Sequence, residues 1–146
     1  EGAHTESIKK LVSGGIPVMG HIGLTPQSVH QLGGFKVQGR DNPEALIEAA
    51  KSIENAGAFA IVLEMVPEEL AAKITKELTI PTIGIGAGKY CDAQVLVWTD
   101  AFGITKNPPK LARAYRNLRI ELLNGAQEFA ADVADGNFPS DKESFR

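Results

Sequence analysis

Cysteine, aromatic residues and long apolar runs are all scarce in this sequence. One cysteine among 146 residues excludes a disulfide within the chain and fits a reducing cytosol. Lys, Glu or Asp interrupts every apolar run before it reaches the length of a membrane-spanning helix. The start of the chain shows neither the basic nor the apolar region of a secretory signal. We therefore expect a cytoplasmic protein with no membrane partner.

The chain also has little net charge, and it lacks the residue spacings of common zinc and calcium sites. The formal net charge is -3 and no stripe of Lys and Arg is visible, which argues against nucleic acid as a partner. No pair of His or Cys has the spacing of a zinc site, and no calcium-binding loop is present. A hydrophobic content of 43% with 23% charged residues is typical of a folded globular chain. The length predicts one domain or part of one.

Short apolar runs alternate with helical patterns along most of the chain. A long glycine-rich loop, 21–41, follows the first predicted strand, and loops of that size are uncommon unless functional. The polar tail 136–146 is expected to be loosely ordered unless it docks. Apolar runs bounded by Gly and Pro predict strands at 16–20, 59–64, 82–85 and 95–99. Helices are predicted at 5–13, 43–55, 67–78 and, with a break near 124–125, at 109–135.

This alternation predicts an α/β fold with a parallel sheet. Four strands could form a small open sheet. They could equally form the second half of an eight-stranded (β/α)8 barrel. Glu1 stands before a helical pattern as a residue at the end of a strand would, which favours a fragment of a larger domain.

Glu64 is the first candidate for chemistry. It ends the apolar run Phe59-Ala60-Ile61-Val62-Leu63, and Met65-Val66-Pro67 follows at once. A carboxylate at the end of a buried strand is costly unless something pairs with it or uses it. In α/β sheets and barrels the carboxyl ends of the strands are where active sites form. The alternative is that Glu64 only begins the loop and caps the next helix.

Two further strand ends carry candidate residues. His21 follows a predicted strand and could donate a hydrogen bond or move a proton, or be an ordinary polar residue. Gly86 and Gly88 follow another strand, where glycine allows close approach of a ligand or simply a tight turn. Cys91 is interpreted as structural, and Asp100 as a turn or cap residue. Asp92 could cap the segment after the glycine loop, and we assign it no chemistry.

Five motifs occur in order along the chain. They are Gly20-His21-Ile22-Gly23-Leu24-Thr25-Pro26-Gln27-Ser28, Gly33-Gly34-Phe35-Lys36-Val37-Gln38-Gly39-Arg40, Val62-Leu63-Glu64-Met65-Val66-Pro67, Ile83-Gly84-Ile85-Gly86-Ala87-Gly88 and Asp100-Ala101-Phe102-Gly103-Ile104. Together they resemble the motifs of the ketopantoate hydroxymethyltransferase family. Any one of them alone would be weak, but the resemblance extends from Glu1 to about Phe145.

The resemblance implies that 1–146 is the C-terminal part of one (β/α)8 TIM-barrel domain, covering strands five to eight. Glu1 then matches an acidic residue of the family's Mg²⁺ site, although Glu1-Gly2-Ala3 departs from the usual acidic-Gly-Gly. Glu64 matches the general base, and His21 matches a histidine near the bound keto acid. Gly86 and Gly88 are expected to contact substrate. The family's remaining metal carboxylates and a substrate-binding serine and lysine lie in its first half.

The implied reaction is an aldol-type hydroxymethyl transfer in pantothenate biosynthesis. Glu64 would remove the C3 proton of 3-methyl-2-oxobutanoate chelated to Mg²⁺, and the enolate would attack the one-carbon unit of 5,10-methylenetetrahydrofolate. The product would be 2-dehydropantoate. The resemblance also implies a homo-oligomer. Half a barrel would expose two unpaired edges and an apolar face, so we expect the fragment to be inactive without its N-terminal half.

Two alternatives stay open at the level of sequence. One is a Mg²⁺-dependent lyase or mutase of the phosphoenolpyruvate mutase and isocitrate lyase group, which would act on a 2-oxo acid without folate. The other is a non-catalytic half-barrel that only completes an assembly. A carboxylate at the end of an apolar strand disfavours the second alternative.

Overall fold

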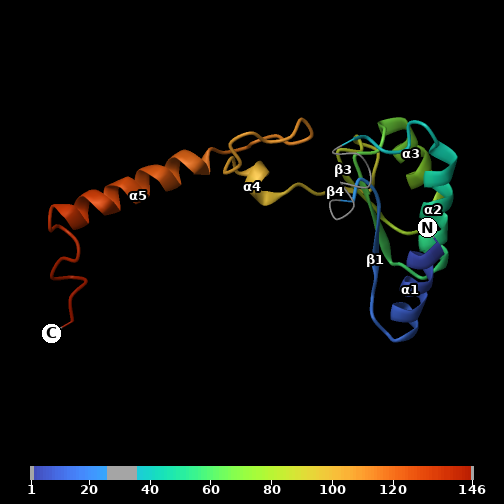
Figure 1. Ribbon diagram of the computed structural model, residues 1–146, viewed down its shortest axis with the longest axis horizontal. Coiled ribbons are helices and arrows are strands. Elements are labelled where there is room, and N and C mark those ends of the chain that lie inside the picture. The colour runs from blue at the N-terminus through green and yellow to red at the C-terminus, as the bar shows by residue number, and fades with distance from the viewer. Residues whose placement is uncertain (1, 26–35, 146) are drawn as a thin grey trace. The chain divides into compact units, whose positions relative to one another are not determined.

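The computed structural model describes residues 2–25 and 36–145, with the backbone alone for residues 2–4. The chain divides into two compact units, Glu1–Val95 and Leu96–Arg146. The first unit contains the sheet and three helices, and the second contains two helices (Figure 1). No helix among the described residues is both long enough and apolar enough to cross a membrane.

The first unit is built on a parallel sheet in which the strands lie in the order of the chain, β1-β2-β3-β4. This confirms the predicted α/β fold with four parallel strands. The strands are β1 Met19–Gly23, β2 Ala60–Glu64, β3 Thr82–Ile85 and β4 Ala93–Gln94. The helices are α1 Gly2–Ser13, α2 Pro43–Asn55 and α3 Glu68–Glu77.

The helix starts follow from local sequence. The Asn42 side chain accepts a hydrogen bond from the Ala45 N–H at 3.2 Å, and Pro43 occupies the first turn of α2, where a missing N–H costs nothing. Pro67 precedes α3, and Glu68 and Glu69 lie in its first turn, where negative charge is favourable. Both α2 and α3 therefore begin a few residues before the first of their side chains that pack against the sheet.

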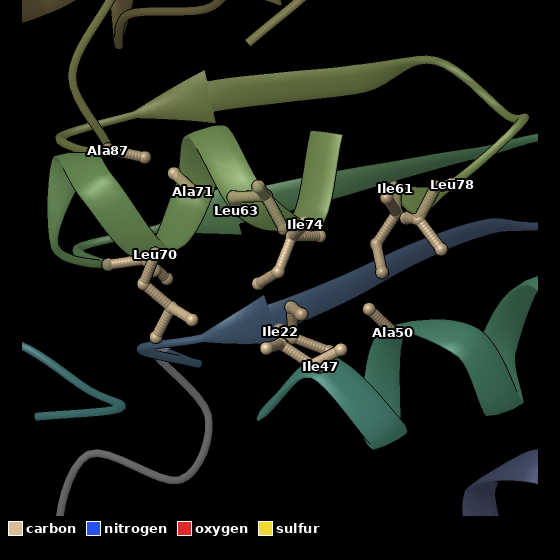
Figure 2. Packing of buried hydrophobic residues seen from close by; sticks show 11 residues of the cluster. Ile22, Ile47, Ala50, Ile61, Leu63, Leu70, Ala71, Ile74, Leu78 and Ala87 are labelled. Carbon is tan, nitrogen blue, oxygen red and sulfur yellow. The ribbon is translucent and has the colours of Figure 1, made fainter. Parts of the chain in front are cut away.

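The hydrophobic core lies between one face of the sheet and the helices. Figure 2 shows Ile22 of β1 against Ile47 of α2, with Ile74 of α3 near Leu63 of β2. Ile61, Leu63 and Ile74 are fully buried. Successive side chains of a strand point to opposite faces of the sheet. Strand residues two positions away from a core residue therefore point to the same face as that core residue. Helices α2 and α3 thus cover one face of the sheet.

The opposite face of the sheet carries the alternate residues of each strand. His21 pairs in register with Val62, and Val62 pairs with Ile83, so these three side chains form one row across the sheet. Val62 and Ile83 are only partly buried, and Met19 of β1 is 45% exposed. Apolar side chains on a half-open sheet face normally find a cover in a folded domain.

The second unit contains α4, Trp98–Ala101, and α5, Leu118–Ala134. The connection between them is held by backbone bonds, in which the Tyr115 N–H donates to Ala101 O and the Leu118 N–H donates to Phe102 O. No residue of α5 is buried, and its apolar side chains include Ile120, Leu122, Leu123, Phe129 and Val133.

The structure corrects two predicted strands. The first strand lies at 19–23, not 16–20, because its pairing with β2 begins only at Met19 and Ala60, and Pro17 has no N–H to donate. The predicted strand at 95–99 is wrong. The ladder ends with β4 at Gln94, and 98–101 are helical; Val95 and Val97 are about half exposed, so this apolar run is not a buried strand.

The long C-terminal helix also differs from its prediction. It begins at Leu118, not near 109, and it runs without a break through Asn124 and Gly125. Gly125 has open space around its Cβ position, so nothing forces the backbone away from helical geometry there. A glycine in a helix interior costs about 1 kcal/mol, which the surrounding helix formers can outweigh.

Candidate active site at the carboxyl ends of the strands

Glu64 is the last residue of β2, as the sequence predicts. Its register partners are Gly23 on β1 and Ile85 on β3, so it lies between two neighbouring strand ends. Its side chain shares the half-open face of the sheet with His21 and is 15% exposed. Glu64 is therefore a mostly buried carboxylate at the edge where parallel α/β sheets place their active sites.

His21 is an ionisable neighbour of this carboxylate. Its Nε2 lies 3.1 Å from Glu64 Oε2 and 3.1 Å from the backbone oxygen of Leu24. The prediction that His21 and Glu64 share one rim is confirmed, but His21 lies inside β1, two residues before the strand ends. The side chain is 36% exposed, so part of the imidazole stays accessible.

The backbone of Glu64 is held by the turn that follows β1. The Leu24 N–H donates to Glu64 O at 2.8 Å, and Leu24 itself is fully buried. Gly23 has a φ of 91°, and a Cβ at that position would lie 2.1 Å from Glu64 O. Only glycine permits both this conformation and this approach. The sequence signal that could have assigned Gly23 this role is a glycine at the end of an apolar strand.

Met65, directly after Glu64, has a φ of 50° and is the one non-glycine residue with positive φ in the described part of the chain. Two backbone bonds hold it there: the Met65 N–H donates to Ile85 O at 2.9 Å, and the Gln38 N–H donates to Met65 O at 2.9 Å. Unfavourable backbone geometry of this kind persists only where surrounding contacts enforce it, and it gathers at functional sites. Nothing in the residues around Met65 predicts this conformation.

The loop after β3 contains both candidate glycines. Gly86 and Gly88 have φ values of 65° and 77°, so the tight-turn interpretation holds for both, while ligand contact stays a prediction. A Cβ on Gly88 would lie 2.3 Å from the Glu68 side chain on α3. The Gln94 amide donates to Gly88 O at 2.9 Å, and Ala87 is fully buried. The loop is thus fixed against both α3 and β4.

Asp92 anchors the far end of this loop. Its Oδ2 accepts hydrogen bonds from the Thr82 N–H at 2.8 Å and from Thr82 Oγ1 at 2.9 Å. These bonds, first the backbone one and then that of the side chain, lower the pKa of the carboxyl group. Thr82 is fully buried, and its Oγ1 lies 2.8 Å from Thr75 Oγ1. Sequence reasoning assigned Asp92 no such contact because Thr82 is ten residues away.

The structure places Cys91 against the core and Asp100 inside α4, whose caps are Val97 and Phe102. Cys91 packs against the core, and burial raises the pKa of its thiol, although hydrogen bonds from Thr75 and Thr82 act in the opposite direction. Asp100 is buried in the first turn of α4, and its backbone oxygen accepts from the Gly103 N–H.

A magnesium site is not formed by the described residues alone. Among them no group of three or more His, Cys, Asp or Glu side chains could hold a metal ion. Glu1, the predicted metal ligand, lies outside the described residues, as does part of the glycine-rich motif, 26–35. The described residues instead bring together a carboxylate, an imidazole and a rigid glycine loop at one strand edge. Such a set can accept a proton from a bound carbon acid.

Comparisons with known proteins find similar sequences over most of the chain. Residues 1–141 match the family model of ketopantoate hydroxymethyltransferase. The chain is 57% identical over 142 residues to 3-methyl-2-oxobutanoate hydroxymethyltransferase of Acidothermus cellulolyticus, covering 96% of this chain and 52% of the relative. It is 54% identical to the Nocardioides protein of the same name, covering 94% of this chain and 48% of the relative.

A third relative of that name, from Thermotoga maritima, is 51% identical over 96% of this chain and 53% of its own length. The chain spans about half the length of the curated relatives it matches. The matched residues include both β1 and β2, with His21 and Glu64, and the glycine loop after β3. The chain therefore belongs to the ketopantoate hydroxymethyltransferase family.

Proposed function

We propose that this chain supplies the general base of a hydroxymethyltransferase that converts 3-methyl-2-oxobutanoate to 2-dehydropantoate with 5,10-methylenetetrahydrofolate. The observation that supports this most directly is the mostly buried Glu64 carboxylate at the end of β2, with His21 Nε2 3.1 Å away. The names of the relatives support the substrate, since each is a 3-methyl-2-oxobutanoate hydroxymethyltransferase.

In the proposed reaction, Glu64 takes the proton from C3 of the keto acid. The carbanion forms a bond to the methylene carbon that bridges two nitrogens of the folate, and one of the two carbon–nitrogen bonds breaks. A water molecule then adds the hydroxyl group to that carbon as the second carbon–nitrogen bond breaks. The proton from C3 and one proton of the water end on the two nitrogens, which leaves tetrahydrofolate. The apolar row of Val62 and Ile83 beside Glu64 would face the methyl groups of the substrate. Gly86 and Gly88 would allow the substrate close approach to the backbone.

Magnesium chelation of the keto acid belongs to the same proposal. The bound ion would stabilise negative charge on the 2-oxo oxygen and so acidify C3. Glu1 is the residue of this chain proposed as a ligand, and the other ligands would lie in the complementary half. The described residues do not form this site by themselves.

We further propose that 1–146 is the C-terminal part of a (β/α)8 barrel, in which β1 to β4 are strands five to eight. The parallel sheet, the helices on one face and the partly buried apolar residues on the other support this. The complementary N-terminal half would cover the half-open face and pair with the free edges of β1 and β4. Assembly into a homo-oligomer is proposed from the family resemblance.

Deuterium exchange at C3 of 3-methyl-2-oxobutanoate tests the role of Glu64 directly. The chain is co-expressed with the part of the Acidothermus cellulolyticus relative that it does not match, and exchange in D₂O is followed by NMR. Glu64→Gln should lower both exchange and hydroxymethyl transfer by about 10²–10⁴-fold, as expected for loss of a general base. Keto-acid binding, measured by equilibrium dialysis, should be largely kept.

Glu69→Gln is the matched control, since Glu69 is an exposed carboxylate in the first turn of α3. It should leave exchange and transfer unchanged. Unchanged activity of Glu64→Gln would favour the non-catalytic half-barrel instead. Turnover of the keto acid without folate would favour the lyase and mutase group. The chain expressed alone should be inactive, and a stable, active 1–146 monomer would contradict the proposed complementary half.

A further inference from the structure

The contacts of His21 define which of its ring nitrogens carries a proton. Nε2 lies 3.1 Å from Leu24 O and 3.1 Å from Glu64 Oε2. A backbone carbonyl oxygen can only accept a hydrogen bond, so Nε2 must be the protonated nitrogen. A single Nε2–H then lies between two oxygens and requires Glu64 Oε2 to be an acceptor as well. Leu24 O thus selects the tautomer that presents a donor to Glu64.

These contacts form a closed ring between the ends of β1 and β2. The Leu24 N–H donates to Glu64 O, the imidazole contacts Leu24 O, and the same imidazole nitrogen contacts Glu64 Oε2. Both the backbone and the side chain of Glu64 are therefore held by the end of one neighbouring strand. The close approach of Gly23 to Glu64 O allows this ring of contacts to form.

We infer that His21 is a positioning residue, whose Nε2–H holds Oε2 of Glu64 so that Oε1 faces the substrate carbon. This inference rests on the proposed function and assigns His21 an action through Glu64. Because Nε2 is already engaged by two oxygens, only the Nδ1 side of the ring is left for a substrate contact. A carboxylate held in one orientation needs no reorientation before proton transfer, and a misplaced catalytic group costs about 10²-fold in rate.

Three substitutions separate positioning from substrate binding, again in the co-expressed protein. His21→Gln keeps an N–H donor three bonds from Cβ, as in Nε2 of histidine, whereas His21→Asn moves the donor to the position of Nδ1. His21→Leu has no donor. We expect His21→Gln to keep kcat within about tenfold of wild type, and His21→Asn and His21→Leu to lose about 10²-fold, all with KM nearly unchanged.

Two kinetic results would overturn the inference. One is a rise in KM with kcat kept in His21→Asn, which would mean that the ring binds substrate. The other is an equal loss of kcat in His21→Gln and His21→Leu, which would mean that the donor has no role. If the wild-type protein catalyses no hydroxymethyl transfer, the proposed function itself is refuted. Failure of the proposed function is therefore distinguishable from failure of the inference about His21.

A measurement without turnover tests the same inference in the wild-type protein. With ¹⁵N-labelled histidine, two-bond correlations between ring protons and ring nitrogens report which nitrogen is protonated. The His21 signals are identified by their loss in His21→Gln. A proton on Nε2 of His21 is the expected result, and a ring without a proton on Nε2 would overturn the inference whatever the kcat of the variants.

Discussion

Replacing Gly23 with alanine should destabilise the first unit and disturb Glu64 together. Gly23 has a φ of 91°, and an alanine Cβ would lie 2.1 Å from Glu64 O and 2.9 Å from Val66 Cγ2. The backbone conformation alone costs a residue with a Cβ about 1–2 kcal/mol. The overlap with Glu64 O forces the strand ends apart and weakens the Leu24–Glu64 hydrogen bond, which is worth about 0.5–1.5 kcal/mol.

The two contributions to the free energy of unfolding add to about 1.5–3.5 kcal/mol for Gly23→Ala. Gly15→Ala is the matched control, because Gly15 has a φ of 79° but nothing within 4 Å of its Cβ position. The control should therefore show only the conformational cost, about 1–2 kcal/mol. The difference between the variants measures the contact with Glu64.

Urea unfolding followed by circular dichroism, at one protein concentration in the co-expressed protein, gives the two stabilities. The kcat for hydroxymethyl transfer should fall in Gly23→Ala and stay near wild type in Gly15→Ala, because Gly23, unlike Gly15, lies against the proposed base. Equal destabilisation by both substitutions, or an unchanged kcat in Gly23→Ala, would refute the argument that close packing of β1 on Glu64 O holds the site together.

Two further predictions concern the segment after β3. Hydrogen bonds from Thr82 lower the pKa of Asp92, so its stabilising effect is present above the ordinary carboxyl pKa of about 3.9 and is lost as pH falls through the lower folded value. Urea midpoints of wild type and Asp92→Asn should therefore differ most near neutral pH and converge in acid; a gap independent of pH would contradict this. Burial raises the pKa of the Cys91 thiol, so iodoacetamide should alkylate Cys91 more slowly at pH 8 than it alkylates glutathione, as followed by peptide mass spectrometry. A rate equal to that of glutathione would contradict it.

The sequence predicted the elements whose apolar pattern and boundaries agree. The α2 helix has Asn42 and Pro43 at its start, and its predicted bounds, 43–55, are those observed. The β3 strand lies between Pro81 and Gly86 and was predicted at its observed position. The segment around Val95 to Trp98 misled the prediction because apolar residues indicate burial only when another element covers them. There Val95, Val97 and Trp98 are about half exposed or more.

The candidate site was only partly predictable for a similar reason. The positions of Glu64 and His21 at one edge followed from parallel strands ending together. Their direct contact did not, because it depends on the register that pairs Gly23 with Glu64 and on the true start of β1. The positive φ of Met65 is set by bonds to Ile85 and Gln38, which come from distant parts of the chain.

The order of the strands has a consequence for how the first unit is made. Each strand of β1-β2-β3-β4 pairs only with strands that are consecutive to it in the chain. Pairing of β1 with β2 therefore needs only the connection through α2, and β3 can then join through α3. The entropy lost on closing a loop grows with the length of the loop. This strand order therefore keeps the entropic cost of each strand pairing low. During synthesis from the N-terminus, the strands that carry His21 and Glu64 can pair before β3 and β4 have left the ribosome.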